Sequence, residues 1–330
     1  MKKSLVLLPL LALSAFICCV SNVQSQAFSD IVGFYHVDLQ PNSNLVVSGL
    51  TTKKEFQGVV TITGGTDSSS FTLSSGSLTA GALNEVTTLG DTITVPSAYM
   101  KILTAGAGEN QVIDVISNTA GQIVGNITND QLTSLGLSGG SAVVAVRKHV
   151  TIQSLFEAAD NVASGDRIDI FDDSGSKVRL LRSGENWFNE SFQNANAFPI
   201  YPAQGILYIS TGAKSVRIGT EQVSYFDEAE SKITVYSGAV NLVGQVNPLN
   251  GENGTLAGTG LQDSLSASDR VDVFQNVGGT FQKVGRYFVS GGNWFDESFV
   301  NSNSVVVPFT SAFNIISASD QAVGVENGVP

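Results

Sequence analysis

The chain contains two tryptophans, and each lies in a short aromatic and polar box that could bind a sugar. Residues 186–192 read Asn-Trp-Phe-Asn-Glu-Ser-Phe, and residues 293–299 read Asn-Trp-Phe-Asp-Glu-Ser-Phe. An aromatic face can stack on the apolar face of a pyranose ring, while nearby amides and carboxylates bind its hydroxyl groups. One interpretation is therefore a carbohydrate-binding module whose ligand-binding residues are Trp187, Glu190, Trp294, Asp296 and Glu297.

The competing interpretation makes each tryptophan the anchor of a hydrophobic core. Large aromatic side chains contribute much of a core's burial. The polar positions differ between the boxes, because Asn189 corresponds to Asp296, whereas the apolar positions are the same. We therefore predict that both tryptophans are buried, together with the phenylalanines of the boxes, Phe188, Phe192, Phe295 and Phe299.

A glycoside hydrolase is a third interpretation. It needs two carboxyl groups about 5–10 Å apart in a cleft, and the candidate pair is Glu190 and Glu297. These residues hold equivalent positions in two similar boxes, so shared structure explains them more simply than shared chemistry. We predict no catalytic residue and expect that the protein is not an enzyme.

Other site patterns in the sequence are incomplete. His36 and His149 lie far apart in the chain, whereas a zinc site needs three or four convergent ligands. Residues 172–175, Asp-Asp-Ser-Gly, match only a fragment of a calcium loop. We predict neither a bound metal nor a cofactor.

The elements that must position these boxes are short strands. Apolar and polar residues alternate at 59–62, 168–171 and 271–274, and glycine pairs at 64–65 and 291–292 mark turns. Short alternating segments separated by glycine turns predict an all-β fold of sandwich or barrel type. Helical periodicity is confined to residues 129–135, 152–159 and 260–265.

The same order of motifs occurs twice, which indicates a duplicated unit. Residues 166–171 read Asp-Arg-Ile-Asp-Ile-Phe and precede the first tryptophan box; residues 269–274 read Asp-Arg-Val-Asp-Val-Phe and precede the second. Strand alternation would place each arginine beside the second aspartate, as an ion pair that faces solvent.

Weaker similarities extend the two units towards the N-terminus. Residues 37–39 and 44–46 correspond to residues 233–235 and 241–243, and both units then continue into a short helix. We predict two homologous β-units, residues 28–215 and 216–330, with a β subdomain inserted in the first at about residues 55–150.

The first 25 residues have the features of a secretory signal peptide. Lys2 and Lys3 precede an apolar run over residues 5–20, and small residues follow it. Cleavage there would remove both cysteines, Cys18 and Cys19, so the mature chain would have no disulfide. It would keep 15 of the 17 basic residues against 29 acidic ones, a net charge of −14 (15 minus 29). Such acidity argues against nucleic-acid binding.

The order of these motifs resembles that of an uncharacterised family of exported, β-rich bacterial proteins with tandem tryptophan-bearing repeats. The resemblance rests on Asp-Ile-Val-Gly-Phe at 30–34, on residues 99–120 and 151–156, and on the two tryptophan boxes. It spans nearly the whole mature chain. The chain departs from the family pattern where Ser48 and Gly49 stand in place of a proline. The resemblance implies export and a repeated β fold, and it implies no activity.

We therefore expect a non-catalytic exported protein that acts at the cell surface or in the extracellular matrix. Its location would be periplasmic, cell-surface or extracellular. Its partners would be a polysaccharide or other surface proteins, and it would have no transmembrane segment after the signal peptide is removed.

Overall fold

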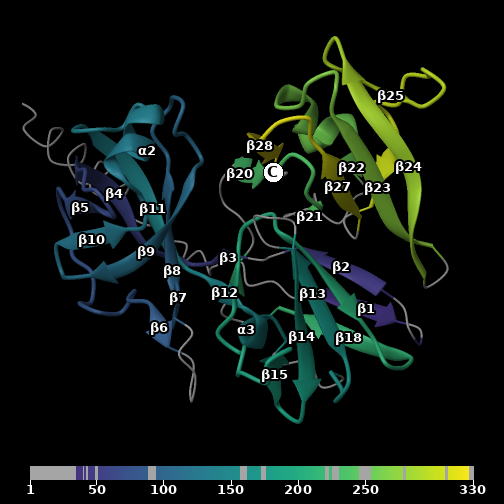
Figure 1. Ribbon diagram of the computed structural model, residues 1–330, viewed down its shortest axis with the longest axis horizontal. Coiled ribbons are helices and arrows are strands. Elements are labelled where there is room, and N and C mark those ends of the chain that lie inside the picture. The colour runs from purple at the N-terminus through teal and green to yellow at the C-terminus, as the bar shows by residue number, and fades with distance from the viewer. Residues whose placement is uncertain are drawn as a thin grey trace, which may run out of the picture. The chain divides into compact units, whose positions relative to one another are not determined.

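A computed structural model describes residues 35–39, 41, 44–48, 51–87, 94–156, 162–171, 176–219, 223–224, 230–244, 254–277, 280–308 and 311–326. Within these residues the fold is all-β, as predicted, with several sheets, one closed six-stranded barrel and only short helices (Figure 1). The predicted signal peptide, residues 1–25, lies outside the described residues, as does the partial calcium motif at 172–175.

The first tryptophan box belongs to a five-stranded antiparallel sheet with the order β15-β14-β13-β17-β2. Its strands are β2 (Asn44–Ser48), β13 (Arg167–Phe171), β14 (Lys177–Ser183), β15 (Asn186–Asn189) and β17 (Gly205–Ile209). Shorter pairs accompany it: β1 (Tyr35–Leu39) with β18 (Lys214–Ile218), β12 (Val150–Thr151) with β16 (Pro199–Ile200), and β3 (Thr51–Thr52) with β19 (Val223–Ser224). The helix α3 (Ile152–Phe156) follows β12.

The second box belongs to a five-stranded antiparallel sheet with the order β21-β27-β23-β24-β25. Its strands are β21 (Asn241–Gly244), β23 (Arg270–Val277), β24 (Thr280–Ser290), β25 (Asn293–Asp296) and β27 (Ala312–Ile316). Two shorter pairs accompany it: β20 (Glu230–Val235) with β28 (Gln321–Glu326), and β22 (Gly254–Thr255) with β26 (Val306–Val307). Two 3₁₀ turns, η2 (Ala257–Thr259) and η3 (Leu261–Asp263), follow β22.

The two sheets connect their strands in the same way. The Asp-Arg segment forms the central strand of each, β13 or β23, and the tryptophan box forms an edge strand, β15 or β25. Each edge hairpin turns on two residues, and a glycine with positive φ comes first in both turns, Gly184 (58°) and Gly291 (57°). Only a residue without a Cβ adopts such a φ readily, which explains the glycine at both turns.

The correspondence between the two sheets is offset by one residue at the Asn-Leu-Val segments. Leu45 pairs with Tyr208 on β17, whereas Asn241 pairs with Ile315 on β27, and Tyr208 and Ile315 hold matching places opposite Ile168 and Val271. The strands therefore correspond in order and direction, but their Asn-Leu-Val letters do not align in register. The strand β18 also continues to Ile218, past the predicted boundary at residue 215.

Each sheet packs one face on a separate hydrophobic core, and a tryptophan lies in each. Trp187 and Trp294 are both 0% exposed. Trp187 packs against Phe156 of α3, with ring centroids 5.7 Å apart, while the Trp294 indole donates a hydrogen bond to Gln262 of η3. The short helical segments therefore cover the tryptophan side of each sheet.

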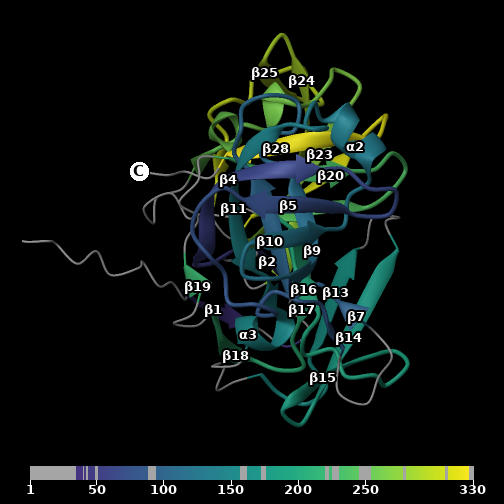
Figure 2. The same cartoon turned by 90° about the vertical axis from the view of Figure 1, so that its left-hand side faces the viewer.

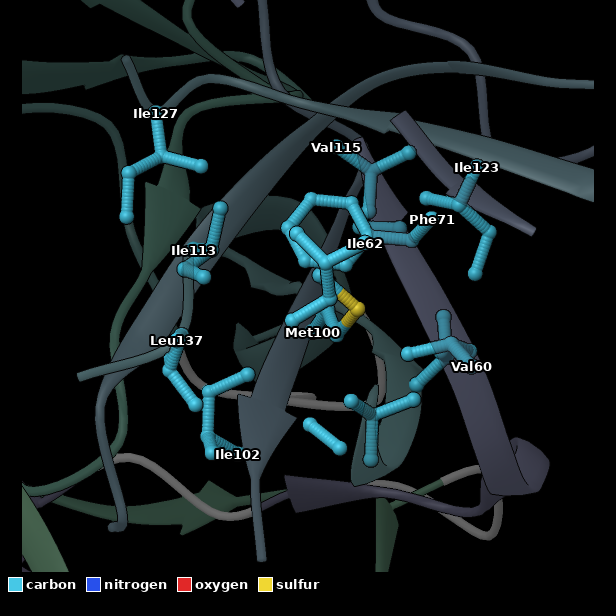
Figure 3. Close-up of a cluster of buried hydrophobic side chains, with 14 of the residues drawn as sticks. Val60, Ile62, Phe71, Met100, Ile102, Ile113, Val115, Ile123, Ile127 and Leu137 are labelled. Carbon is cyan, nitrogen blue, oxygen red and sulfur yellow. The ribbon is translucent and has the colours of Figure 1, made fainter. Parts of the chain in front are cut away.

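The residues between β3 and β12 form the closed barrel, whose strand order is β10-β5-β4-β11-β8-β9 (Figure 2). Its strands are β4 (Lys54–Thr63), β5 (Ser69–Leu73), β8 (Ala98–Ile102), β9 (Val112–Asn118), β10 (Gln122–Gly125) and β11 (Ser141–Lys148). A small pair, β6 (Val86–Thr87) with β7 (Thr94–Val95), and the helix α2 (Asn129–Ser134) complete this part. Alternate side chains fill the barrel, and Figure 3 shows Val60, Ile62, Phe71, Met100, Ile113 and Val115 converging on its centre.

The structure corrects two expectations about individual side chains. Phe192 and Phe299, expected in the cores, are 84% and 76% exposed. Phe188 and Phe295, also expected in the cores, are only partly buried and lie on the sheet face opposite the tryptophans, because successive strand residues point to opposite faces. Asp169 and Asp272, expected in solvent-facing ion pairs, are only 3% and 6% exposed. The expected pair between Arg167 and Asp169 does form, at 3.3 Å, but Arg179 and Arg286 of the neighbouring strands also cover the two carboxylates.

Candidate binding face

The outer face of each sheet, opposite its core, carries a row of apolar side chains and one arginine. In the first sheet Arg167 pairs with both Ile209 and Leu181, and Leu181 pairs with Phe188. In the second sheet Arg270 pairs with Ile316, and Phe288 pairs with Phe295. The guanidinium carbon of Arg270 lies 4.9 Å from the centroid of Phe288, which links the two halves of this row. We call these two sets the outer rows.

A row of charges runs beside each outer row. In the second sheet Arg286 forms a bidentate pair with Asp272 at 2.6 and 2.8 Å, and this pairing lowers the pKa of Asp272 and raises that of Arg286. The negative charge of Glu297 also raises the pKa of Arg286. The charges of this row are therefore largely matched within the sheet.

The first sheet repeats this charge row with weaker geometry. The Nε atom of Arg179 lies 3.1 Å from Asp169, and its terminal nitrogen lies 3.5 Å from Glu190. The Glu190 side chain is 64% exposed, so solvent screens its pair with Arg179. Glu190 and Glu297 thus extend the charge rows towards the ends of the edge hairpins.

Each edge strand runs into a tight turn, which we call a hairpin tip: residues 189–193 in the first sheet and 296–300 in the second. The Asn189 side-chain oxygen accepts hydrogen bonds from the backbone N–H groups of Ser191 (3.0 Å) and Gln193 (2.8 Å). An Asp296 carboxylate oxygen accepts from Ser298 and Val300, both at 2.9 Å. An amide oxygen and a carboxylate oxygen serve equally well in this role, which explains why Asn and Asp interchange here.

The phenylalanine of each hairpin tip has a left-handed backbone. The φ angles are 60° at Phe192 and 61° at Phe299. Each backbone N–H donates to the carbonyl three residues earlier, that of Asn189 or Asp296, at 2.9 Å. Glycine or asparagine is usual at such a position. A bulky residue there costs about 1–3 kcal/mol, and rings that are 84% and 76% exposed regain little of it by burial.

The asparagines that begin the boxes serve the protein itself. The Asn186 side-chain oxygen accepts from Asn196, whose own side-chain oxygen accepts from the Trp187 backbone N–H at 2.8 Å. Asn293 and Asn303 make the same arrangement with the Trp294 backbone. The segments at 194–196 and 301–303 thereby cover the outer edges of β15 and β25, which removes an open edge for strand addition.

The five residues predicted to bind a ligand do not form one surface within either sheet. Trp187 and Trp294 face the cores and present no ring face to solvent. Glu190 and Glu297 are exposed at the hairpin tips, and Asp296 holds its own turn. Among the described residues, the aromatic side chains that are mostly exposed are Phe192 and Phe299. The clue to them in the sequence is that Glu-Ser-Phe recurs in both boxes just where the strand must turn.

Both sheets also contain a buried carboxylate at the start of the central strand. Asp166 is 0% exposed and lies 2.7 Å from the Lys214 ammonium group. It also accepts from the Tyr208 hydroxyl and from the Thr211 backbone at 2.9 Å. Burial alone would raise the pKa of Asp166, but these hydrogen bonds outweigh it and lower the pKa. Burial and the same carboxylate raise the pKa of Tyr208.

Asp269 is held in the same place, and its partners among the described residues are uncharged. It accepts from the backbone of Ala318 (2.9 Å) and Ser266 (2.8 Å), and from the Gln321 amide at 2.9 Å. Burial again acts to raise its pKa, and these hydrogen bonds lower it. Each carboxylate thus ties the central strand to the turn that precedes β18 or β28, which is a structural function.

The described residues place one acid beside a histidine. His149 Nε2 lies 3.1 Å from Asp114, which also accepts from the Tyr201 hydroxyl at 2.6 Å. The other ring nitrogen of His149 is buried and has no hydrogen-bond partner in the described part of the chain, so no serine or threonine completes a triad there. Asp114 and Tyr201 line a cavity of about 290 Å³ that Lys232 and Tyr236 also line.

Comparison with protein-family models, with curated proteins and with solved structures finds no match. Within the residues that the structure describes, no group of histidine, cysteine and acidic side chains has the arrangement of a metal site. The helices in that part of the chain are all too short to cross a membrane.

Proposed function

We propose that this chain is an exported, non-catalytic interaction protein of the cell surface or extracellular matrix, and that it binds through its two hairpin tips. One observation carries the proposal: Phe192 and Phe299 are 84% and 76% exposed while their backbones hold a strained left-handed turn. A packing role accounts poorly for backbone strain at residues whose rings are mostly exposed, even though the Phe299 ring contacts Phe288. An exposed ring that meets a partner does account for it.

We also infer that the two β-units arose by duplication. This inference is supported by the matching boxes, by the shared strand pairing, and by the buried carboxylates at Asp166 and Asp269. Export is supported by the predicted signal peptide and by the resemblance to an exported bacterial family. A duplicated unit would give one chain two equivalent binding elements.

The residues that the two alternative functions require are not placed as those functions need. A carbohydrate-binding module built on the tryptophans would need an accessible indole face, and both indoles are buried. A glycoside hydrolase would need Glu190 to face a second carboxylate, whereas its described partner is Arg179 at 3.5 Å. The interaction function needs neither an indole face nor a carboxylate pair.

The test is retention of purified chain 26–330 on isolated cell envelopes of the organism that encodes it. We expect wild-type protein to be retained, and the double variant Phe192→Gly/Phe299→Gly to be retained at least about tenfold less. The matched control is Val59→Ala/Val143→Ala. It shortens two apolar side chains that are 43% and 37% exposed and pair with each other on the adjacent barrel strands β4 and β11.

Two results would contradict the proposal. One is a wild-type protein that no envelope fraction retains. The other is a control variant that loses as much retention as the tip variant, because the hairpin tips would then have no special part.

A further inference from the structure

The hairpin tips present their phenylalanines as rigid anchors. In each tip one side-chain oxygen accepts two backbone N–H groups, and the Phe192 or Phe299 N–H closes the turn. Phenylalanine has only two side-chain torsions, so little entropy is lost when its ring is fixed in a complex. The second ring is steadied further, because Phe299 packs edge-to-face on Phe288 with centroids 5.3 Å apart.

The chemistry of a phenylalanine ring indicates the shape of its partner. The ring has no donor or acceptor group, so its binding energy comes from removing both of its faces and its edge from water. A sugar ring is flat on this scale and covers one face. A concave apolar pocket in a folded protein covers the whole ring, and rings of this kind form the energetic centre of protein interfaces.

The charges around the rings indicate the rim of that pocket. Glu190 and Glu297 are exposed two residues before the phenylalanines, and the chain without its leader has a net charge of −14 (15 minus 29). This potential repels the anionic surface of a bilayer and attracts a basic surface. It also opposes docking of a second copy of this acidic chain.

We propose that each hairpin tip inserts its phenylalanine into an apolar pocket with a basic rim on a partner protein, and that the two tips make one chain bivalent. This rests on the proposed function and names its partner class. The sites on the partner are two copies of one pocket, because both tips present the same Glu-Ser-Phe sequence on the same turn. Linking two such contacts in one chain strengthens retention by avidity.

The experiment divides the isolated envelope into the classes of partner that it contains. Fluorescently labelled chain 26–330 is added to untreated envelopes, to protease-treated envelopes, to periodate-treated envelopes, and to vesicles made from phosphatidylethanolamine and phosphatidylglycerol. We expect protease treatment to abolish retention, periodate to leave it unchanged, and the vesicles to bind nothing. Retention should also fall as salt rises, because the rim contacts are electrostatic.

Four single variants and one double variant test the two phenylalanines and their acidic neighbours. Phe192→Gly and Phe299→Gly should each weaken retention at least about tenfold, and the double variant should remove it. Glu190→Gln and Glu297→Gln keep the rings and should reduce the salt dependence of retention. Circular dichroism spectra matching the wild type will show that each variant is folded.

Each outcome decides a separate question. Retention that survives protease and is lost with periodate would replace the protein partner by a polysaccharide, and binding to the vesicles would replace it by lipid. Concentration-dependent self-association in sedimentation that the double variant abolishes would make the partner a second copy. Those results overturn this inference and leave the interaction function standing, whereas absence of retention on untreated envelopes overturns both.

Discussion

The two buried tryptophans differ in one hydrogen bond, and this difference predicts unequal effects of the same substitution. The Trp294 indole N–H donates to the Gln262 side chain at 3.1 Å. The Trp187 indole N–H is buried and has no hydrogen-bond partner among the described residues. We predict that Trp294→Phe destabilises its sheet more than Trp187→Phe destabilises the other.

The size of the difference follows from the two environments. Both rings are 0% exposed, so the lost apolar burial is similar at the two sites. Losing a hydrogen bond costs about 1 kcal/mol, whereas removing an unsatisfied buried donor recovers about 1–3 kcal/mol. The expected difference in unfolding free energy is therefore about 2–4 kcal/mol. A weaker contact with the Arg182 guanidinium, 5.6 Å from the Trp187 centroid, reduces the difference by less than about 1 kcal/mol.

Native-state hydrogen exchange measures the opening free energy of each sheet separately. The relevant amides are those of β14 and β15 in Trp187→Phe and those of β24 and β25 in Trp294→Phe, each compared with wild type. The full truncations Trp187→Ala and Trp294→Ala serve as the reference, with an expected loss of about 3–5 kcal/mol each. An equal or larger loss in Trp187→Phe would refute the reasoning, because the unpaired indole N–H would then carry no penalty.

Three further predictions concern the hairpin tips and the buried carboxylates. Phe192→Gly should be more stable than Phe192→Ala by about 0.5–1 kcal/mol, the reverse of the usual order, because only glycine relieves the left-handed backbone; urea midpoints would show this, and a more stable alanine variant would contradict the φ assignment. The folded protein lowers the pKa values of Asp166, Asp269 and Asp272, so these carboxylates stabilise it above about pH 4, and this stabilisation is lost as the pH falls through their lowered pKa values. The urea midpoint should therefore be constant from about pH 7 to about pH 5 and should decrease at pH values below about 4. A midpoint that stays constant down to about pH 3 would count against these networks. Lys214→Met should lower the unfolding free energy by about 3–5 kcal/mol, because it leaves the buried Asp166 carboxylate without its cation. Lys214→Gln should cost less, because a glutamine amide can donate to this carboxylate as Gln321 donates to Asp269. Equal losses in thermal or urea unfolding would mean that the site needs the positive charge.

Several features were predictable from the sequence because they depend on local patterns. Alternation at residues 168–171 and 271–274 depends only on the two-residue period of a strand, and both segments are central strands. Two of the short helices predicted from helical periodicity are also confirmed: α2 covers Asn129–Ser134, and α3 begins at Ile152. The burial of Trp187 and Trp294 followed from their size and their apolar neighbours.

The destination of the second phenylalanine in each box was not predictable from composition. Trp187 and Phe192 lie five residues apart in one box, and apolar character alone assigns both to the core. The turn between them reverses the chain and sets Phe192 at φ 60°, so its ring points to solvent instead. A φ angle is decided by which backbone groups the turn must satisfy, and the oxygen that satisfies them belongs to Asn189.

The sequence by itself determined the β class, the repeated boxes and the buried tryptophans, because strand period and side-chain size act within a few residues. The tertiary structure alone decided which charges are buried and which aromatic rings are exposed. The sequence alone does not distinguish Asp166 from a surface aspartate. In the fold its carboxylate is buried against Lys214, 48 positions later in the chain, at 2.7 Å. Apolar character predicts that Phe192 and Phe299 are core residues, whereas the turns after β15 and β25 place their rings in solvent. Such outcomes depend on contacts between distant segments, and those contacts exist only once the sheets have formed.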